Sequence, residues 1–476
     1  MSMKAIKYLV MGVVLAGFST SAVAQDGTKA DIDAVKKLVS SKPADLADQM
    51  KAFEKKNKKN AENLTAFGRA FYEAKDTANA SKYADLALKA DKQYAPAYIL
   101  KGDLSALAED GGAAASFYDQ AIYFDPKNPD GYRKYASVYR KISPQGAIAK
   151  LNDLRAQVPD YPVDAIIGHI SYISNNFDEA IAAYDKVPKD KLEKMDIIES
   201  AFSAYLTQKY DKGIEMAEFG LQKEPRNSTL NRLAMFCNTE KGNFDKALDY
   251  ADKLFNKSDS ANISYMDYVY YGNALNGQKR HDEAIEMFKK ALDQEFDNAD
   301  KKAGVVKTLS DAYKGINDYE NAITYYERYL TDVSKASATD HAGLGRLYAQ
   351  YAQSLEDEAA KLATLKKADD VYAGLLTKYS DIDDYVAFQR ARIGMQMDPE
   401  SKQELAKPHY EKLVDLLGAK ADRDNTDKVR LIEAYRYLIS YYLLNKDDKE
   451  TAKEFAQKLQ EVDPENETAK QVLELK

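Results

Sequence analysis

A repeated spacing of small and large residues constrains this chain more than any other feature. Gly102 is followed after twelve residues by Ala114, after four more by Tyr118 and after three more by Ala121. Recurrence of one spacing along a chain is the signature of a repeat architecture, in which each copy buries its apolar face against the next. The same intervals begin again at Gly68, Gly168, Ala201, Gly272, Ser310 and Ser440.

The spacing is helical. Steps of four and three residues place Ala114, Tyr118 and Ala121 on one face of a helix, and a step of twelve crosses a turn into the preceding antiparallel helix. Residues 176–178 and 281–282 supply the Asn and Asp side chains that end one helix and cap the next. With only 12 Pro and 22 Gly in 476 residues, we expect an all-α fold of paired helices.

The pattern resembles the tetratricopeptide repeat (TPR) family, whose helix-turn-helix units are about 34 residues long. Residues 268–272, Tyr-Val-Tyr-Tyr-Gly, together with residues 282–292 match the signature of that family most closely. The resemblance extends over roughly residues 61–464. It implies a right-handed superhelical α-solenoid in which every unit is stabilised by its neighbours.

The small residue of each first helix marks the units. We expect capping helices in residues 25–60, units 1–8 in residues 61–335, and irregular units 9–11 with a C-terminal capping helix in residues 336–476. A hinge or a second sub-array near residue 335 is expected because the connections lengthen toward the C-terminus. The eleven markers are Gly68, Gly102, Ala136, Gly168, Ala201, Ala234, Gly272, Ser310, Tyr348, Gln389 and Ser440.

The N-terminus has the order of a secretory signal. Lys4 and Lys7 precede an apolar run over residues 8–18, and small residues lead to Ala24. We expect cleavage after Ala24, which takes the formal net charge from −8 to −10, and an exported, periplasmic protein with no stable membrane insertion. The alternative is a retained anchor, although eleven helical residues span only about 16 Å of a roughly 30 Å hydrocarbon core.

Charge and composition argue against several function classes. An acidic chain opposes nucleic-acid binding, which needs clustered cations. The four His residues are too far apart for a helical zinc site, and a single Cys cannot form an internal disulfide. Cys237 lies on an apolar stripe and is expected to be a buried thiol. We expect no metal, no cofactor and no catalytic residue, with an enzyme of unrecognised type as the remaining alternative.

The 35 Tyr residues suggest a binding surface as well as a core. In the TPR proteins that this chain resembles, certain first-helix positions face a concave groove, which suits an extended or helical peptide. Tyr437 and Tyr441 map to such positions. The alternative is that several of these side chains only bridge neighbouring units. The principal groove residues expected are Tyr72, Arg133, Arg140, Lys141, Tyr172, Phe202, Tyr205, Asn231, Asn238, Asn273, Asn276 and Lys307.

These expectations combine into one function hypothesis and one rival. The first is an exported, non-catalytic TPR scaffold that binds a protein or peptide along its concave groove. The rival is a cell-envelope assembly or secretion accessory factor that binds through convex or C-terminal surfaces. The identity of the partner does not follow from the sequence.

Overall fold

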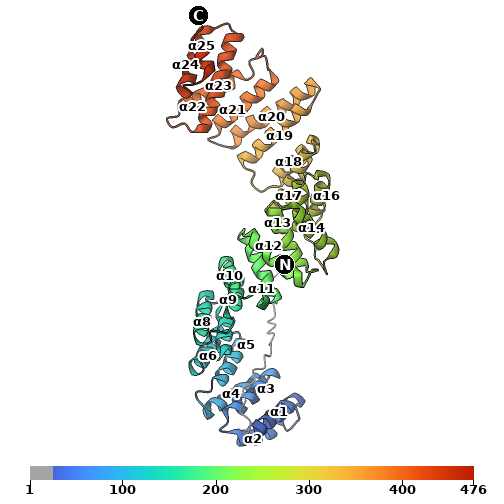
Figure 1. The fold of residues 1–476 in the computed structure, drawn as a ribbon, viewed down its shortest axis with the longest axis vertical. Helices are drawn as coiled ribbons and strands as arrows, with labels where there is room; N and C mark the ends of the chain where they lie inside the picture. The colour runs from blue at the N-terminus through green and yellow to red at the C-terminus, as the bar shows by residue number, and fades with distance from the viewer. Residues whose placement is uncertain (1–24, 476) are drawn as a thin grey trace. The chain divides into compact units, whose positions relative to one another are not determined.

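The computed structural model describes residues 25–475, so the expected signal segment 1–24 lies outside the described residues. The described chain is helical and contains no strand (Figure 1). The expected all-α solenoid class is therefore confirmed. The chain divides into two compact units, the first ending at Lys209 and the second beginning at Tyr210. The expected boundary near residue 335 falls inside the second unit and stays a prediction.

The first unit contains helices α1 to α11. A short 3-10 helix, Lys189–Lys191, precedes the last of them. The α-helices are α1 Gln25–Ser41, α2 Leu46–Asn57, α3 Ala61–Glu73, α4 Thr77–Ala90, α5 Ala95–Leu107, α6 Gly111–Phe124, α7 Pro129–Tyr139, α8 Pro144–Gln157, α9 Val163–Ile173, α10 Phe177–Tyr184 and α11 Lys194–Leu206.

The second unit contains helices α12 to α25. A π-helical segment, Lys253–Lys257, continues α14. The α-helices are α12 Tyr210–Lys223, α13 Ser228–Glu240, α14 Phe244–Asp252, α15 Tyr265–Gly277, α16 His281–Leu292, α17 Ala299–Gly315, α18 Tyr319–Asp332, α19 Ala338–Ser354, α20 Glu358–Lys378, α21 Asp383–Met397, α22 Lys407–Gly418, α23 Asn425–Leu444, α24 Lys449–Val462 and α25 Glu467–Leu473.

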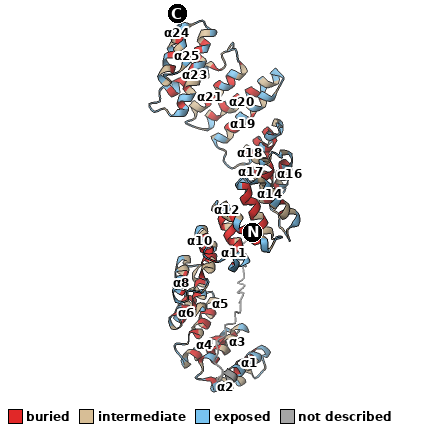
Figure 2. Cartoon of the chain, viewed as in Figure 1, coloured by how far each residue is buried: buried red, intermediate tan, exposed pale blue. Residues whose placement is uncertain are grey.

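Small residues on the first helices lie against rings on the second helices, as the spacing predicts. A Cβ atom added to Gly168 would lie 2.7 Å from the Tyr184 ring, and one added to Gly272 would lie 2.5 Å from the Phe288 ring. In these two pairs, only glycine allows the helices to approach this closely. The buried residues follow these inner faces (Figure 2).

Two of the expected markers are wrong. In α19 the residue that faces the second helix is Gly345, not Tyr348, because Gly345 lies against the Tyr372 ring. In α21 it is Gly394, not Gln389, because Gly394 lies against the backbone of Ala406. All eleven expected markers nevertheless lie in odd-numbered helices from α3 to α23.

Seven of the turns inside helix pairs share one backbone geometry. Lys75 and Lys279 have φ values of 61° and 60°, in the left-handed region. The amide of the next residue then returns to the first helix: Asp76 N–H donates to the Phe71 carbonyl at 2.9 Å, and Arg280 N–H donates to the Leu275 carbonyl at 3.0 Å. These bonds pair carbonyl groups that a helix end leaves open. The same left-handed position recurs at Glu109, Asn175, Gln208, Gly242 and Asn317.

Candidate interaction surfaces

A buried carboxylate joins three neighbouring first helices in the first unit. Asp103 of α5 is 5 % exposed. It pairs with Arg69 of α3 and lies 2.7 Å from the Lys134 Nζ atom of α7. The Tyr118 hydroxyl donates at 2.7 Å to the same carboxylate oxygen that Lys134 contacts, and Arg69 contacts the other oxygen. A buried charge is tolerated only when it is paired and hydrogen-bonded, so this arrangement fixes the order and spacing of α3, α5 and α7.

A second buried carboxylate, Glu199, joins α9, α10 and α11. Its side chain is 5 % exposed, and the His169 Nδ1 atom lies 3.0 and 3.1 Å from its two oxygens. The Tyr184 hydroxyl donates to it at 2.5 Å. Burial, together with the Glu199 carboxylate, raises the pKa of Tyr184 far above its usual value. The tyrosine therefore stays a proton donor in this contact.

We call such a carboxylate, together with its partners on neighbouring helices, a joint. Similar joints occur in the second unit. Arg232 of α13 forms two hydrogen bonds to the fully buried Asp267 of α15, at 2.5 and 3.1 Å. Arg392 of α21 forms two to Glu433 of α23, at 2.8 and 2.5 Å. Burial alone would raise the pKa of Glu433, but the hydrogen bonds from Arg392 and Tyr410 outweigh it and hold the pKa below its usual value. These ion pairs hold neighbouring first helices together.

Four aromatic side chains form a cluster on α9, α10 and α11, and we call it the Tyr172 cluster. The Tyr172 ring lies 6.1 Å from the Phe177 ring and 6.3 Å from the Phe202 ring, and Phe202 lies 6.2 Å from Tyr205. All four are half-buried. The structure thus brings together three of the expected groove residues, Tyr172, Phe202 and Tyr205, directly beside the Glu199 joint.

The remaining expected residues of the first unit do not join this cluster. Tyr72 is half-buried at the end of α3, and burial raises its pKa. Arg133 is exposed on α7 and lies 3.4 Å from Asp130 of the same helix. Arg140 and Lys141 lie in the turn after α7, where Lys141 is exposed and Arg140 is half-buried.

In the second unit, the structure corrects two of the expected groove residues. Asn231 and Asn238 of α13 are 0 % exposed. The Asn231 amide donates to the carbonyls of Pro225 and Asn227, and the Asn238 amide donates to the Ala234 carbonyl at 2.8 Å. A side chain without exposed surface does not contact a partner. These two amides hold the backbone before and within α13 instead.

The other three expected residues of the second unit keep some exposed surface. Asn273 and Asn276 are half-buried on α15, and the Asn276 side-chain oxygen contacts His281. Lys307 of α17 lies 2.7 Å from Asp340 and 4.7 Å from the centre of the Tyr329 ring. Lys307 therefore links α17 to α19. This matches the alternative that some of the expected groove residues bridge neighbouring units.

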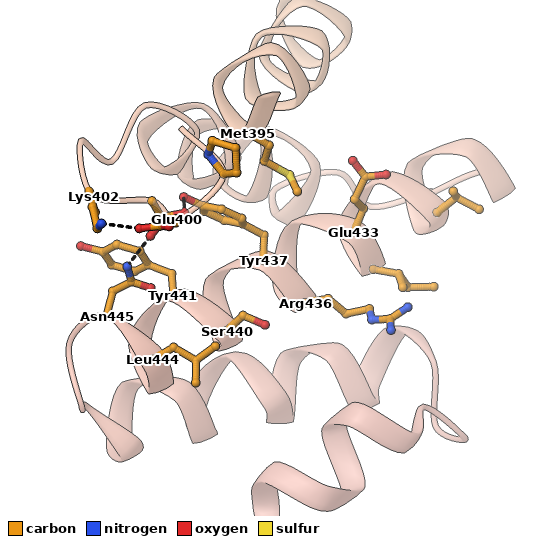
Figure 3. A pocket seen from close by; sticks show the side chains of 14 residues that line it. Met395, Glu400, Lys402, Glu433, Arg436, Tyr437, Ser440, Tyr441, Leu444 and Asn445 are labelled. Carbon is orange, nitrogen blue, oxygen red and sulfur yellow. Dashed lines mark hydrogen bonds and ion pairs between the residues drawn. The ribbon is translucent and has the colours of Figure 1, made fainter. Parts of the chain in front are cut away.

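A recess of about 840 Å³ lies in the second unit between the end of α21, the following loop and α23 (Figure 3). Tyr437 and Tyr441 of α23 line it, as their mapped positions suggest, and Met395 of α21 lines it as well. The loop wall of the recess, residues 399–402, does not follow from the sequence, because a loop has no periodicity from which to infer its path. The helical repeat pattern also leaves the exposed apolar side chains Val429 and Leu444 unassigned.

Within the described residues, no group of three or more His, Cys, Asp and Glu side chains is placed to hold a metal ion. No helix between residues 25 and 475 has the length and apolar character needed to cross a membrane.

Comparisons with known proteins agree with the observed architecture. The tetratricopeptide repeat family model matches residues 268–298, 308–331 and 434–466, which lie in α15–α16, α17–α18 and α23–α24. No curated protein sequence matches the chain.

Several solved structures are similar. The C-terminal part of a TPR repeat-containing protein from Cytophaga hutchinsonii has 23 % identity, a TM-score of 0.48, and coverage of 58 % of this chain and 100 % of that chain. A tetratricopeptide repeat protein from Parabacteroides merdae has 18 % identity, a TM-score of 0.33, and coverage of 54 % and 98 %. YrrB, described as a TPR protein with an unusual peptide-binding site, has 16 % identity, a TM-score of 0.26, and coverage of 50 % and 97 %.

Proposed function

Because the chain is a tetratricopeptide repeat protein, we propose that it is an exported scaffold that binds a protein partner through the exposed faces of its first helices, without catalysing a reaction. TPR units are protein-interaction modules, and a scaffold is the role that such an array supports. Export is the proposal drawn from the signal-like order of residues 4–24.

The Tyr172 cluster carries the proposal for where binding occurs in the first unit. Its four rings are half-buried on neighbouring helices, with centroids 6.1 to 6.3 Å apart. Aromatic side chains supply large contact areas at a low cost in conformational entropy, and they are enriched where partners bind. The adjacent Glu199 joint holds α9 and α11 in place, so the rings form a preorganised surface.

The experiment compares a cluster variant with a matched control. Phe202→Ala with Tyr205→Ala removes two rings of the cluster, whereas Tyr123→Ala removes a ring that is 80 % exposed on α6. Each full-length protein is used to capture partners from periplasmic extract, and the captured partner is then purified for direct binding. We expect the double variant to lose at least about tenfold in affinity and the control to bind normally.

Circular dichroism of each variant establishes that the helices remain. A folded double variant that binds the partner as tightly as the unaltered protein contradicts the proposed site. Export is measured separately: mature protein from the native host should begin at Gln25, and a protein that retains residues 1–24 in the cytoplasm contradicts that part of the proposal.

A second candidate function is a cell-envelope assembly or secretion accessory factor that binds through C-terminal surfaces. The recess between α21 and α23 favours it, because this surface lies in the tenth and eleventh helix pairs. Loss of partner binding on truncation near residue 336, with binding unaffected by the Phe202 and Tyr205 substitutions, supports this candidate over the first.

A further inference from the structure

One exposed face of α23 carries an arrangement that the scaffold proposal does not use. Val429, Arg436, Ser440 and Leu444, which we call the α23 stripe, line the recess described above. At about 100° per residue, the four side chains fall within roughly 80° of the helix circumference. Val429 is 61 % exposed and Leu444 is 83 % exposed, although apolar side chains of this size are usually buried in helices.

We propose that the α23 stripe binds an amphipathic helix of a partner protein that presents an acidic side chain between two apolar side chains, each about one heptad away. The inference rests on the proposal that the chain is a protein-binding scaffold, and it names the chemistry of a partner.

Arg436 gives the α23 stripe a positive charge. Two carboxylates that line the recess already have basic partners, because Glu433 pairs with Arg392 and Glu400 pairs with Lys402. Among the described residues, Arg436 forms no ion pair, and it is exposed. It therefore offers an uncompensated guanidinium group, whose planar donors match the geometry of a carboxylate.

The polar groups of the recess favour a helical partner over an extended peptide. An extended backbone brings N–H and C=O groups that need partners. The hydroxyl groups of Tyr437 and Ser401 contact each other at 3.0 Å, and the Asn445 amide donates to the Glu400 carbonyl at 2.7 Å. Because these polar groups are already engaged, the recess offers few partners to an extended backbone. A helix satisfies its own backbone.

The spacing of the α23 stripe matches such a helix. Seven residues separate Val429 from Arg436 and eight separate Arg436 from Leu444, which corresponds to about 10.5 and 12 Å along α23. A partner helix with apolar side chains one heptad on either side of an acidic residue presents intervals of about 10.5 Å each, which differ from these by no more than the rise of one residue. The half-buried Tyr437 ring and the Met395 side chain, which is 40 % exposed, supply further apolar surface in the recess (Figure 3).

Synthetic peptides test the inference with the full-length protein. A helical peptide of about 20 residues carries Leu at both apolar positions and Glu, Gln or Lys at the centre. Binding is measured by fluorescence anisotropy at two salt concentrations. We expect the Glu peptide to bind most tightly and to lose affinity at high salt. We expect Arg436→Glu to weaken its binding at least about tenfold and to make the Lys peptide the preferred ligand.

Two substitutions complete the design. Leu444→Ser should weaken all three peptides about equally, since it removes an apolar contact and no charge. Lys428→Glu is the matched charge control: it lies on α23, it is exposed, and it projects about 120° around the helix from Ser440. This control should leave binding unchanged.

Several outcomes overturn the inference. Equal affinity for the Glu and Gln peptides shows that Arg436 does not contact the central acidic residue. Affinity that is unchanged by Leu444→Ser shows that the α23 stripe is not the binding surface. Concentration-dependent self-association that Leu444→Ser abolishes identifies a second copy of this chain as the occupant instead. Because the Phe202 and Tyr205 variant alters a different unit, it should bind these peptides normally, so a failure here is distinguishable from a failure of the proposed function.

Discussion

Asp340 illustrates how single residues in this chain carry opposing electrostatic effects. Burial alone would raise the pKa of its carboxyl group, but hydrogen bonds from Lys307 and Ser337 outweigh that effect and hold the pKa well below its usual value. The ionised carboxylate lies 2.7 Å from the Lys307 Nζ atom. It also accepts hydrogen bonds from the Ser337 hydroxyl and backbone amide at 2.6 and 3.0 Å, which begins α19.

The lowered pKa predicts a pH dependence of stability. Because the folded state binds the Asp340 proton less tightly than the unfolded state, this carboxylate stabilises the fold above the unfolded pKa of about 3.9, and that contribution disappears as the pH falls through the folded pKa. Asp340→Asn should therefore lower the free energy of unfolding at pH 7 but have a shrinking effect below pH 4.

Denaturant unfolding at several pH values measures this effect. Asp282→Asn, at an exposed position on α16, is the control and should change stability little at any pH. If Asp340→Asn lowers the free energy of unfolding by the same amount at pH 7 and near pH 2, the prediction is contradicted.

At this scale the sequence predicts burial better than it predicts partners. Cys237 is 0 % exposed, as expected, and burial raises the pKa of its thiol to about 12. Asn231 is equally buried, although it was expected in a groove. Periodicity gives the direction in which a side chain points, but it does not reveal the carbonyls of Pro225 and Asn227 that bind the amide.

Turn geometry is the feature that repeats most regularly among the helices. The left-handed position in these turns is occupied by glycine only at Gly242, and by other residues elsewhere. A residue with a Cβ atom pays roughly 1–2 kcal/mol for this conformation. The two hydrogen bonds that follow, such as those donated by Lys279 and Arg280 N–H at 2.9 and 3.0 Å, maintain the turn despite that cost.

The turn geometry predicts opposite effects for one substitution at two sites. Lys279→Gly should raise the free energy of unfolding by roughly 0.5–1 kcal/mol. Glycine relieves the strain of the left-handed conformation, and the greater entropy of the unfolded chain offsets part of that gain. Lys290→Gly, inside α16, should lower it by about 1 kcal/mol. Both lysines are exposed. Chemical denaturation measures both values, and equal effects at the two sites contradict this assignment of strain.

The sequence predicts helices with regular spacing and fails where helices lengthen. Gly272 and Ala284 keep the twelve-residue step, but α19 and α20 have 17 and 21 residues. Extra turns move the second helix of that pair along the chain, so counting from α17 selects Tyr348 in place of Gly345. The step of twelve returns between Gly394 and Ala406, yet the long connections around α21 conceal it.

At the scale of the whole chain, stability is distributed among neighbouring helices. The buried apolar residues form separate clusters, one of which contains Phe288 with residues of α15 to α19. In such an array each unit is stabilised mainly by contacts with the units beside it. Damage to one cluster should therefore remain local.

Phe288→Ala tests this locality. Its ring is fully buried, and its loss should cost roughly 3–5 kcal/mol. Hydrogen exchange should accelerate in α15 to α18 and stay unchanged in α3 to α8. Tyr123→Ala, at an exposed ring, should change neither region. Accelerated exchange across α3 to α8 in the Phe288 variant contradicts nearest-neighbour stabilisation.

The Asp103 joint limits how such an array can be rearranged. Uniform spacing suggests modules that can be duplicated, deleted or shuffled freely. However, the carboxylate of Asp103 takes one cation from the helix pair before it, Arg69, and another from the pair after it, Lys134. A copy moved elsewhere would leave a desolvated negative charge without its counterions, at a cost of several kcal/mol. A helix pair that carries such a carboxylate is therefore stable only between neighbours that supply the matching cations. A chain in which the pairs are reordered must also replace these charged residues.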